Sequence, residues 1–127
     1  MSHKIPANLL YTKEHEWIEV KGDIARLGVT DFAQSSMGDI VFIEAPDAGS
    51  NLSQNAACGV VESIKSVSDI FSPVSGIVIE TNADVTSSPE LVNSDPYAAW
   101  IIKIKLSNTK ELSLLMNAAQ YAEHCKA

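Results

Sequence analysis

Cationic residues are almost missing from the middle of this 127-residue chain. Between Leu27 and Ile102 there are ten acidic residues, no histidine and no arginine, and Lys65 is the only cation. The whole chain carries a formal net charge of −7, with 16 acidic residues against 9 Lys plus Arg. Proteins that bind nucleic acids normally have a basic patch, so the sequence argues against a DNA or RNA partner. An acidic surface suits docking onto basic patches of other proteins.

Cysteines, long apolar runs and targeting features are also scarce. Cys58 and Cys125 are too few and too far apart for a zinc motif or a CxxC pair, which predicts two free thiols and no metal site. No segment approaches the run of about 20 apolar residues that a membrane helix needs. The start, MSHKIPANLL, has neither the apolar core of a signal peptide nor the arginine-rich character of a transit peptide. We therefore expect a cytoplasmic protein that does not enter a membrane.

Catalytic motifs are missing as well. The sequence contains no nucleophile elbow and no phosphate-binding glycine loop. His15 has no Ser or Cys placed beside it by the sequence, so we interpret it as a turn or packing residue. Trp17 and Trp100 are most simply core residues. These absences disfavour an enzyme.

What is present predicts one mainly β domain over residues 1–127, with its core at about 16–106 and a helix packed over the sheet. Hydrophobic residues make up 46% of the chain and charged residues 20%, as is usual for a globular protein. EWIEV, the turn KGD and IARLGV predict a hairpin over 16–29. β-prone runs predict further strands over 39–45, 58–63, 77–80 and 100–106.

Three segments have helical patterns. TDFAQSSM (30–37) begins with a Thr or Asp suited to an N-cap. SSPELV (87–92) predicts a short helix with Ser88 as N-cap and Pro89 at its first position. A C-terminal helix is expected over about 110–125, where one stripe collects Leu112, Leu115, Met116, Ala119 and Ala122.

The segment around the lone lysine, VVESIKSVSD (60–69), fits two structures. Its apolar residues recur at the spacing of an amphipathic helix, on which the lysine would be an ordinary solvated side chain. Against the helix, the segment is rich in β-branched residues and interrupted by serines, which favour a β-hairpin. At a hairpin turn Lys65 would project from the protein, and the small neighbours Ser63 and Ser66 would leave its amine accessible. It would then suit the acceptance of an activated acyl group better than Schiff-base catalysis.

Five segments, in order, resemble the H protein of the glycine cleavage system. They are YTKEHEW (11–17), GVTDFAQSSMGDIVFIEAPDAG (28–49), VVESIKSVSDIFSPVSG (60–76), SPELVNSDPY (88–97) and WIIKIKL (100–106). The family's lipoyl-lysine signature falls on Lys65, with Gly49 before it and Gly76 after it at the spacing of lipoyl-bearing domains. The resemblance implies a barrel-sandwich hybrid, two small sheets with the modified lysine at a hairpin tip.

The resemblance also implies a carrier rather than an enzyme. Lipoate would be bound covalently as N6-lipoyl-lysine at Lys65, attached by a lipoate ligase or a lipoyl/octanoyl transferase. The carrier would take an aminomethyl group from the P protein (glycine decarboxylase) to the T protein (aminomethyltransferase). It would pass reducing equivalents to the L protein (dihydrolipoyl dehydrogenase). We expect a monomer, whose tethered cofactor is concentrated near each partner.

Further site residues follow from the same resemblance. Glu16 and Asp69 match acidic positions near the docked, cationic aminomethyl-lipoyl arm, where a carboxylate could pair with an ammonium. The lipoylating enzyme is expected to recognise the surroundings of the lysine, namely Glu62, Ser63, Ser66 and Asp69. Solvated surface acids are the alternative for Glu16, Glu62 and Asp69.

Other functions remain open at this stage. An H-like protein could serve lipoate transfer to other complexes rather than glycine decarboxylation. Biotinyl domains place the lysine between methionines, whereas Lys65 lies between Ile64 and Ser66. Lipoyl domains of 2-oxo acid dehydrogenases usually have Asp before the lysine. An unmodified β-sandwich would leave the isolated lysine unexplained.

Overall fold

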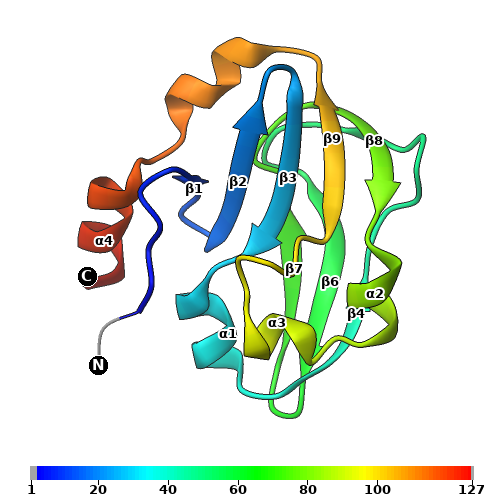
Figure 1. Ribbon diagram of the computed structural model, residues 1–127, viewed down its shortest axis with the longest axis vertical. Coiled ribbons are helices and arrows are strands. Elements are labelled where there is room, and N and C mark those ends of the chain that lie inside the picture. Colours follow the sequence, from blue (N-terminus) through cyan, green and yellow to red (C-terminus); the bar gives the residue numbers. More distant parts are fainter. Residues whose placement is uncertain (1–2, 127) are drawn as a thin grey trace.

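Two antiparallel sheets packed against each other form the body of the protein in a computed structural model that describes residues 3–126 (Figure 1). The larger sheet has the strand order β1-β2-β3-β9-β8-β5 and the smaller one β4-β6-β7. The strands are β1 (Leu10–Tyr11), β2 (Glu16–Lys21), β3 (Ile24–Val29), β4 (Ile40–Glu44), β5 (Asn51–Leu52), β6 (Ala57–Ser63), β7 (Val67–Phe71), β8 (Gly76–Thr81) and β9 (Ile102–Leu106).

The hairpin predicted over 16–29 is confirmed as β2 and β3, paired from Glu16↔Val29 to Lys21↔Ile24. Its turn uses Gly22, whose φ of 64° is in the left-handed region that glycine adopts without steric cost. The predicted strands over 39–45, 58–63, 77–80 and 100–106 are confirmed as well, within a few residues at their ends. The two-residue strand β5, which pairs with β8, was not among the predicted strands.

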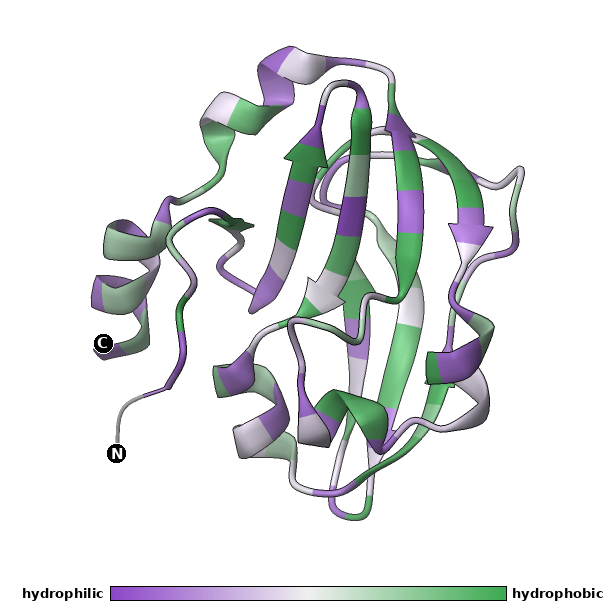
Figure 2. Ribbon diagram, viewed as in Figure 1, coloured by the Kyte–Doolittle hydropathy of each residue, from purple (hydrophilic) through white to green (hydrophobic). Residues whose placement is uncertain are grey.

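The main core lies between the two sheets. Period-two alternation along the strands turns one face of each sheet inward, which Figure 2 shows as alternating hydropathy along β2, β3 and β9. Buried members come from both sheets: Ile18, Leu27, Val78 and Ile104 from the larger one, and Ile43, Val61 and Ile70 from the smaller one. The smaller sheet, which carries the segment around Lys65, is therefore fixed to the larger one by a shared apolar layer.

The helical segments agree only in part with the sequence prediction. Helix α1 (Asp31–Met37) forms as expected, with the Thr30 hydroxyl accepting a hydrogen bond from the Ala33 N–H at 3.2 Å. The helix expected over 87–92 is wrong. Two short helices, α2 (Ala83–Ser87) and α3 (Leu91–Ser94), form instead and overlap the predicted range only at its two ends.

The side-chain cap in this region is supplied by Asn82 at the start of α2, whereas α3 follows Glu90 without a side-chain cap. The Asn82 side chain accepts a hydrogen bond from the Asp84 N–H at 3.2 Å and so begins α2. Ser88 ends that helix, since its N–H donates to the Asp84 carbonyl at 3.0 Å. The turn after it leads directly into α3.

The single C-terminal helix expected over 110–125 is also wrong in its bounds. A 3-10 helix (Thr109–Leu114) is followed by a break and then by α4 (Ala118–Lys126). At the break Met116 pairs with Tyr11 through two backbone hydrogen bonds of 2.8 and 2.9 Å, which requires extended backbone. Asn117 and Gln120 then each accept a hydrogen bond from the other's N–H at 2.9 Å and start α4 as a capping pair.

Helix α4 packs through Tyr121, a buried residue that the sequence pattern had not singled out. Its ring stacks on Tyr11 with centroids 4.6 Å apart, and its hydroxyl lies 2.7 Å from both Thr30 Oγ1 and His15 Nδ1. The interpretation of His15 as a packing residue is confirmed, because its ring also stacks on Phe32. Burial lowers the pKa of His15, in keeping with a neutral ring at this position.

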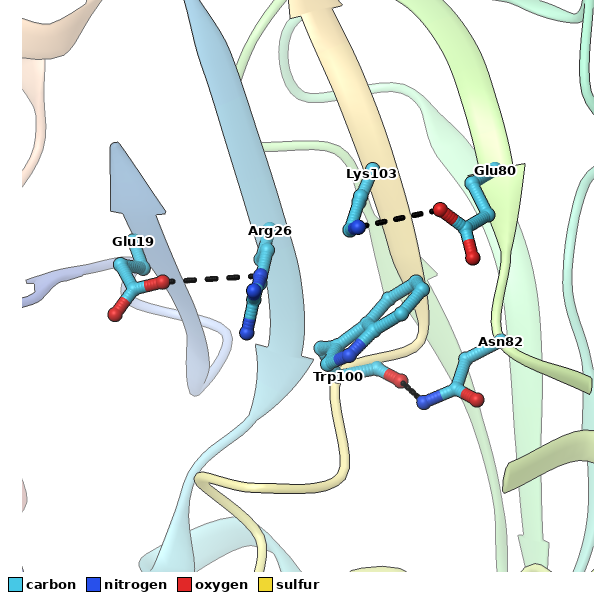
Figure 3. A network of polar contacts seen from close by, with 6 residues as sticks. All are labelled: Glu19, Arg26, Glu80, Asn82, Trp100 and Lys103. Atoms are coloured by element: carbon cyan, nitrogen blue, oxygen red, sulfur yellow. Dashed lines mark hydrogen bonds and ion pairs between the residues drawn. The ribbon is translucent and has the colours of Figure 1, made fainter. Parts of the chain in front are cut away.

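Only one of the two tryptophans is fully buried. Trp17 is buried, and its indole N–H donates to the carbonyls of Val29 and Pro96. Trp100 is only partly buried and packs against the edge of the cluster formed by Leu9, Tyr11, Trp17 and Tyr121, so its assignment to the core is confirmed only in part. Figure 3 shows it on the larger sheet near Arg26 and Lys103, whose charged groups lie 5.8 and 5.0 Å from its ring centroid. Cation–π attraction acts on its exposed side.

Two further observations concern the described residues 3–126. None of their helices is long and apolar enough to cross a membrane. Both cysteines are free, as predicted, and no group of three His, Cys, Asp or Glu side chains in this range is arranged to hold a metal ion.

Candidate functional site

The segment around Lys65 is a β-hairpin, so the helical alternative is wrong. Strands β6 and β7 pair from Ala57↔Phe71 to Glu62↔Val67, and the turn between them projects from the body of the protein at the bottom of Figure 1. Its β-branched residues thereby occupy the extended backbone that suits them. Lys65 lies in this turn and is exposed to solvent, at the end of a rigid pair of strands.

Ser63 holds the turn together. Its N–H donates to the Ser66 carbonyl at 2.8 Å, and its hydroxyl oxygen accepts hydrogen bonds from the N–H groups of Lys65 at 3.3 Å and Ser66 at 3.1 Å. The two serine hydroxyls lie 3.2 Å apart. A serine hydroxyl therefore takes the place of a backbone acceptor in a turn that contains no glycine. The small side chains also leave the lysine uncovered.

The tip is fastened to the body of the protein at the junction of α1 and β4. The Ile64 N–H donates to the Asp39 carbonyl at 3.0 Å. The Lys65 side chain passes close to Gly38, where a Cβ atom would lie 3.5 Å from Lys65 Cε. Gly38 has a φ of 77° and ends α1. The residue before Lys65 is thus bonded to the body of the protein, while Lys65 itself stays exposed.

Replacing Ser63 by alanine is expected to loosen the turn without unfolding the protein. The variant keeps the Ser63 N–H donor but loses the acceptor for two amides, which costs about 1 kcal/mol locally. The Lys65 and Ser66 amides should then exchange hydrogen roughly five times faster, as measured by NMR hydrogen exchange. Ser66→Ala is the matched control, because it keeps the Ser63 hydroxyl, and its turn amides should exchange at the parent rate. Equal exchange in Ser63→Ala would show that the hydroxyl does not hold the turn.

Glu16 is not a solvated surface acid, for its residue is only 2% exposed. One carboxylate oxygen accepts a hydrogen bond from the Thr12 hydroxyl at 2.6 Å, and the other accepts from the Phe71 N–H at 3.1 Å. The second bond ties β2 of the larger sheet to β7 of the smaller one. Burial raises the pKa of Glu16 to about 7, although both hydrogen bonds act in the opposite direction.

A cavity of about 420 Å³ opens beside Glu16. It lies between the turn before β2, the loop before β6, the end of β7 and the 3-10 helix, and Glu16 forms part of its wall. Other lining residues include Thr12, Lys13, Glu14, Gln54, Phe71 and Leu114. Sequence reasoning had found Glu16 but not its partners. The one sequence feature that could have pointed to Thr12 is its place four residues before Glu16, in the motif that supplied the resemblance.

The structure brings only some of the expected site residues together. Ser63, Lys65 and Ser66 meet in the turn, as described above. Glu62 is half-buried on β6, and Asp69 is exposed on β7 opposite Val60. Asp69 does not line the cavity, whereas Phe71, two residues further on the same face of β7, does.

Comparisons with known proteins agree with this architecture. A family model described as "Glycine cleavage H-protein" matches residues 9–127. The chain is 54% identical over 118 residues to the glycine cleavage system H protein of Symbiobacterium thermophilum, covering 92% of each. It is 49% identical over 123 residues to that of Alkaliphilus oremlandii, covering 97% of each. The chain belongs to the glycine cleavage H-protein family.

A solved H-protein structure extends the match to three dimensions. The crystal structure of the glycine cleavage system H protein from Mycobacterium marinum superposes with a TM-score of 0.89 at 35% identity, covering 97% of this chain and all of that one. The predicted fold class, a mainly β barrel-sandwich hybrid with short helices and a C-terminal helix, is therefore confirmed.

Membership of the glycine cleavage H-protein family identifies the class of function. H proteins are non-catalytic lipoyl carriers of the glycine cleavage system, and the family carries its cofactor as lipoyl-lysine. The partners of this H protein are the P, T and L proteins of that system. Such a carrier needs a presented lysine rather than a catalytic constellation, and the hairpin supplies one.

Proposed function

We propose that Lys65 is the lysine that carries the lipoyl group, joined through its Nζ atom as an amide. The observation that carries this proposal is the position of Lys65 at the tip of a braced hairpin, with no second lysine or arginine between residues 28 and 102. An enzyme that approaches the tip therefore meets one amine. The lipoyl group, once attached, supplies the redox-active dithiolane, while the protein supplies presentation and docking.

The surroundings of Lys65 are proposed to be read by the lipoate ligase or lipoyl/octanoyl transferase that modifies it. Ser63 and Ser66 fix the turn and leave room for the enzyme, as their hydrogen bonds indicate. Glu62 and Asp69 place carboxylates on the two strands behind the tip, where they can pair with cationic side chains of the enzyme.

Glu16 and Asp69 are proposed to receive the arm when it carries its cationic aminomethyl group. Support comes from the cavity beside Glu16, whose wall contains a carboxyl group with a pKa of about 7. A cation in that cavity would favour the ionised carboxylate and be held by it. Asp69 lies outside the cavity, on the same face of β7 as Phe71, and would act on the arm before it enters.

The remaining parts of the proposal concern the chain as a whole. We place it in the cytoplasm as a monomer and as one domain over 1–127, with a core at about 16–106 that is shared by both sheets.

Mass spectrometry tests the attachment site. The chain is expressed in cells supplied with lipoate, and its intact mass and peptide map are recorded. We expect one lipoyl amide, on the peptide that contains Lys65. An unmodified Lys65 in cells that lipoylate a control domain, or a lipoyl group on another lysine, would refute the proposal.

A further inference from the structure

The outward face of the three-stranded sheet carries a regular pattern of apolar and acidic side chains. Residues opposite one another in antiparallel strands share a face, and the register places Phe42, Glu62 and Val67 in one row across β4, β6 and β7. The next row, further from the tip, consists of Glu44, Val60 and Asp69. Each acid in one row thus stands next to an apolar residue in the other. We name these six residues the checkerboard face.

Two of the three apolar members of this face, Phe42 and Val67, are open to solvent, and Val60 is half-buried. Phe42 is 44% exposed and Val67 is 67% exposed, and Ile64 at the tip is 70% exposed. A register shift between Ile40 and Phe42 marks a β-bulge, which leaves Val41 as an extra residue that is itself 56% exposed. Four of the eight large hydrophobic side chains exposed in the described part of the chain therefore gather on β4 and the hairpin. Exposed apolar side chains in such a cluster mark interaction sites.

The charges of the face point to the chemistry of its partner. Glu44 and Asp69 are exposed and Glu62 is half-buried, and residues 28–102 contain no cation other than Lys65. The cations of the larger sheet lie elsewhere, on β2, β3 and β9: Lys21, Arg26, Lys103 and Lys105. Three carboxylates between three apolar side chains are complementary to a surface of apolar and Lys or Arg side chains.

We propose that the checkerboard face is the docking surface for the enzyme that attaches lipoate to Lys65, and that this enzyme meets it with apolar and cationic side chains. This inference rests on the proposed function, because it takes Lys65 as the attachment site. Its new members are Phe42, Glu44, Val60 and Val67, which are distant in sequence from the lysine or lack charge. Phe42 is the anchor, as the one aromatic side chain among them.

The length of the lysine side chain indicates that the lipoate-attaching enzyme, rather than the P, T or L protein, binds to this face. An enzyme that acylates the bare amine must bring its active site to within one lysine side chain of the hairpin backbone. It therefore contacts the adjoining sheet face. Enzymes that act on the far end of an attached lipoyl arm work further from the hairpin. In the attachment step the neutral amine attacks the carbonyl carbon of lipoyl adenylate, the C–N bond forms, the bond to AMP breaks, and the amine proton passes to solvent.

Steady-state lipoylation of surface variants tests this docking. Unmodified chain is titrated against a lipoate protein ligase with lipoate and ATP, and the added mass is followed. Phe42→Ser and Glu44→Lys should each lower kcat/KM at least roughly tenfold, through KM, with kcat changed less than about twofold. The defect of Glu44→Lys should shrink as salt is added, because it is electrostatic. Matched controls are Ile79→Ser, 44% exposed on β8, and Glu90→Lys, exposed beside α3, and both should behave like the parent.

The outcomes separate this inference from the proposed function. If the parent chain is not modified on Lys65, the attachment site is wrong. If the parent is modified and both face variants match its kcat/KM, the attachment site stands and the docking surface is wrong. Thermal unfolding shows whether each variant is folded. If Phe42→Ser does not fold, the result for Glu44→Lys alone tests the docking surface. A loss seen only in glycine cleavage by chains lipoylated beforehand would also overturn the inference, since it would assign the face to another partner.

Discussion

Replacing Lys65 by arginine is expected to abolish carrier activity without disturbing the fold. Arginine keeps the positive charge and the length of the exposed side chain, so the turn built by Ser63 should remain. A guanidinium stays protonated in proteins and cannot accept the acyl group. Without the lipoyl group the system has no site for its chemistry. Glycine cleavage in the presence of the P, T and L proteins should fall to the background rate, a loss on the order of 10³-fold or more.

Two measurements check this result. Intact mass should show no lipoyl addition to Lys65→Arg, and the release of carbon dioxide from glycine should match a mixture that lacks the carrier. Lys105→Arg is the control, because Lys105 is also exposed but lies on β9, with Asp23 3.8 Å from its amine. It should be lipoylated and active. A lipoyl group on Lys65→Arg would show that a different lysine is the attachment site.

The sequence could predict the presentation of this lysine because local rules suffice for it. β-Branched residues, a turn of small serines and an isolated cation all lie within 60–71. Periodicity alone left a helix open, and β-branched residues favoured the correct alternative. The family resemblance then added the two-sheet arrangement. No local pattern shows that Ile64 meets Asp39 or that Lys65 meets Gly38, because these contacts depend on how the junction of α1 and β4 packs against the hairpin.

Where prediction went wrong, tertiary contacts had overridden a local pattern. The apolar stripe over 110–125 is helical in period, but pairing of Met116 with Tyr11 breaks it into two helices. The Asn82 cap displaces the helix expected after Ser88 for a similar reason, since its side-chain amide also donates to the Trp100 carbonyl at 2.8 Å. Glu16 shows the same limit at the site. Alternation along β2 could place it on the inner face, but not reveal that Phe71 and Thr12 would satisfy its carboxylate there.

Replacing Glu16 by glutamine is expected to remove a pH dependence of stability that this single buried carboxyl creates. Burial raises the pKa of Glu16 in the folded protein to about 7, against 4.5 for an exposed glutamate. The folded state therefore binds the proton more tightly than the unfolded state does. The resulting stability is fully present below about pH 4.5 and is lost as the pH rises through about 7. At 1.36 kcal/mol per pKa unit, the loss amounts to about 3 kcal/mol.

Urea unfolding at pH 4.5 and pH 8 measures this effect. At each pH the free energy of unfolding of Glu16→Gln is subtracted from that of the parent. This difference should be about 2–3 kcal/mol smaller at pH 8 than at pH 4.5. Glu90→Gln is the control, because Glu90 is exposed and does not line the cavity, and its free energy of unfolding should follow that of the parent at both pH values. If the difference for Glu16→Gln is the same at both pH values, Glu16 ionises as an ordinary carboxyl.

The same variant connects stability to the arm. A carboxyl group that is reluctant to ionise becomes charged more readily when a cation enters the cavity, so a docked cationic arm should pull the pKa of Glu16 down. The destabilisation of the parent at pH 8 would then be relieved by the arm itself. Glutamine cannot respond in this way, so loading of the arm should stabilise the parent at pH 8 and leave Glu16→Gln unchanged. Equal stabilisation of the two chains would place the docked arm away from Glu16.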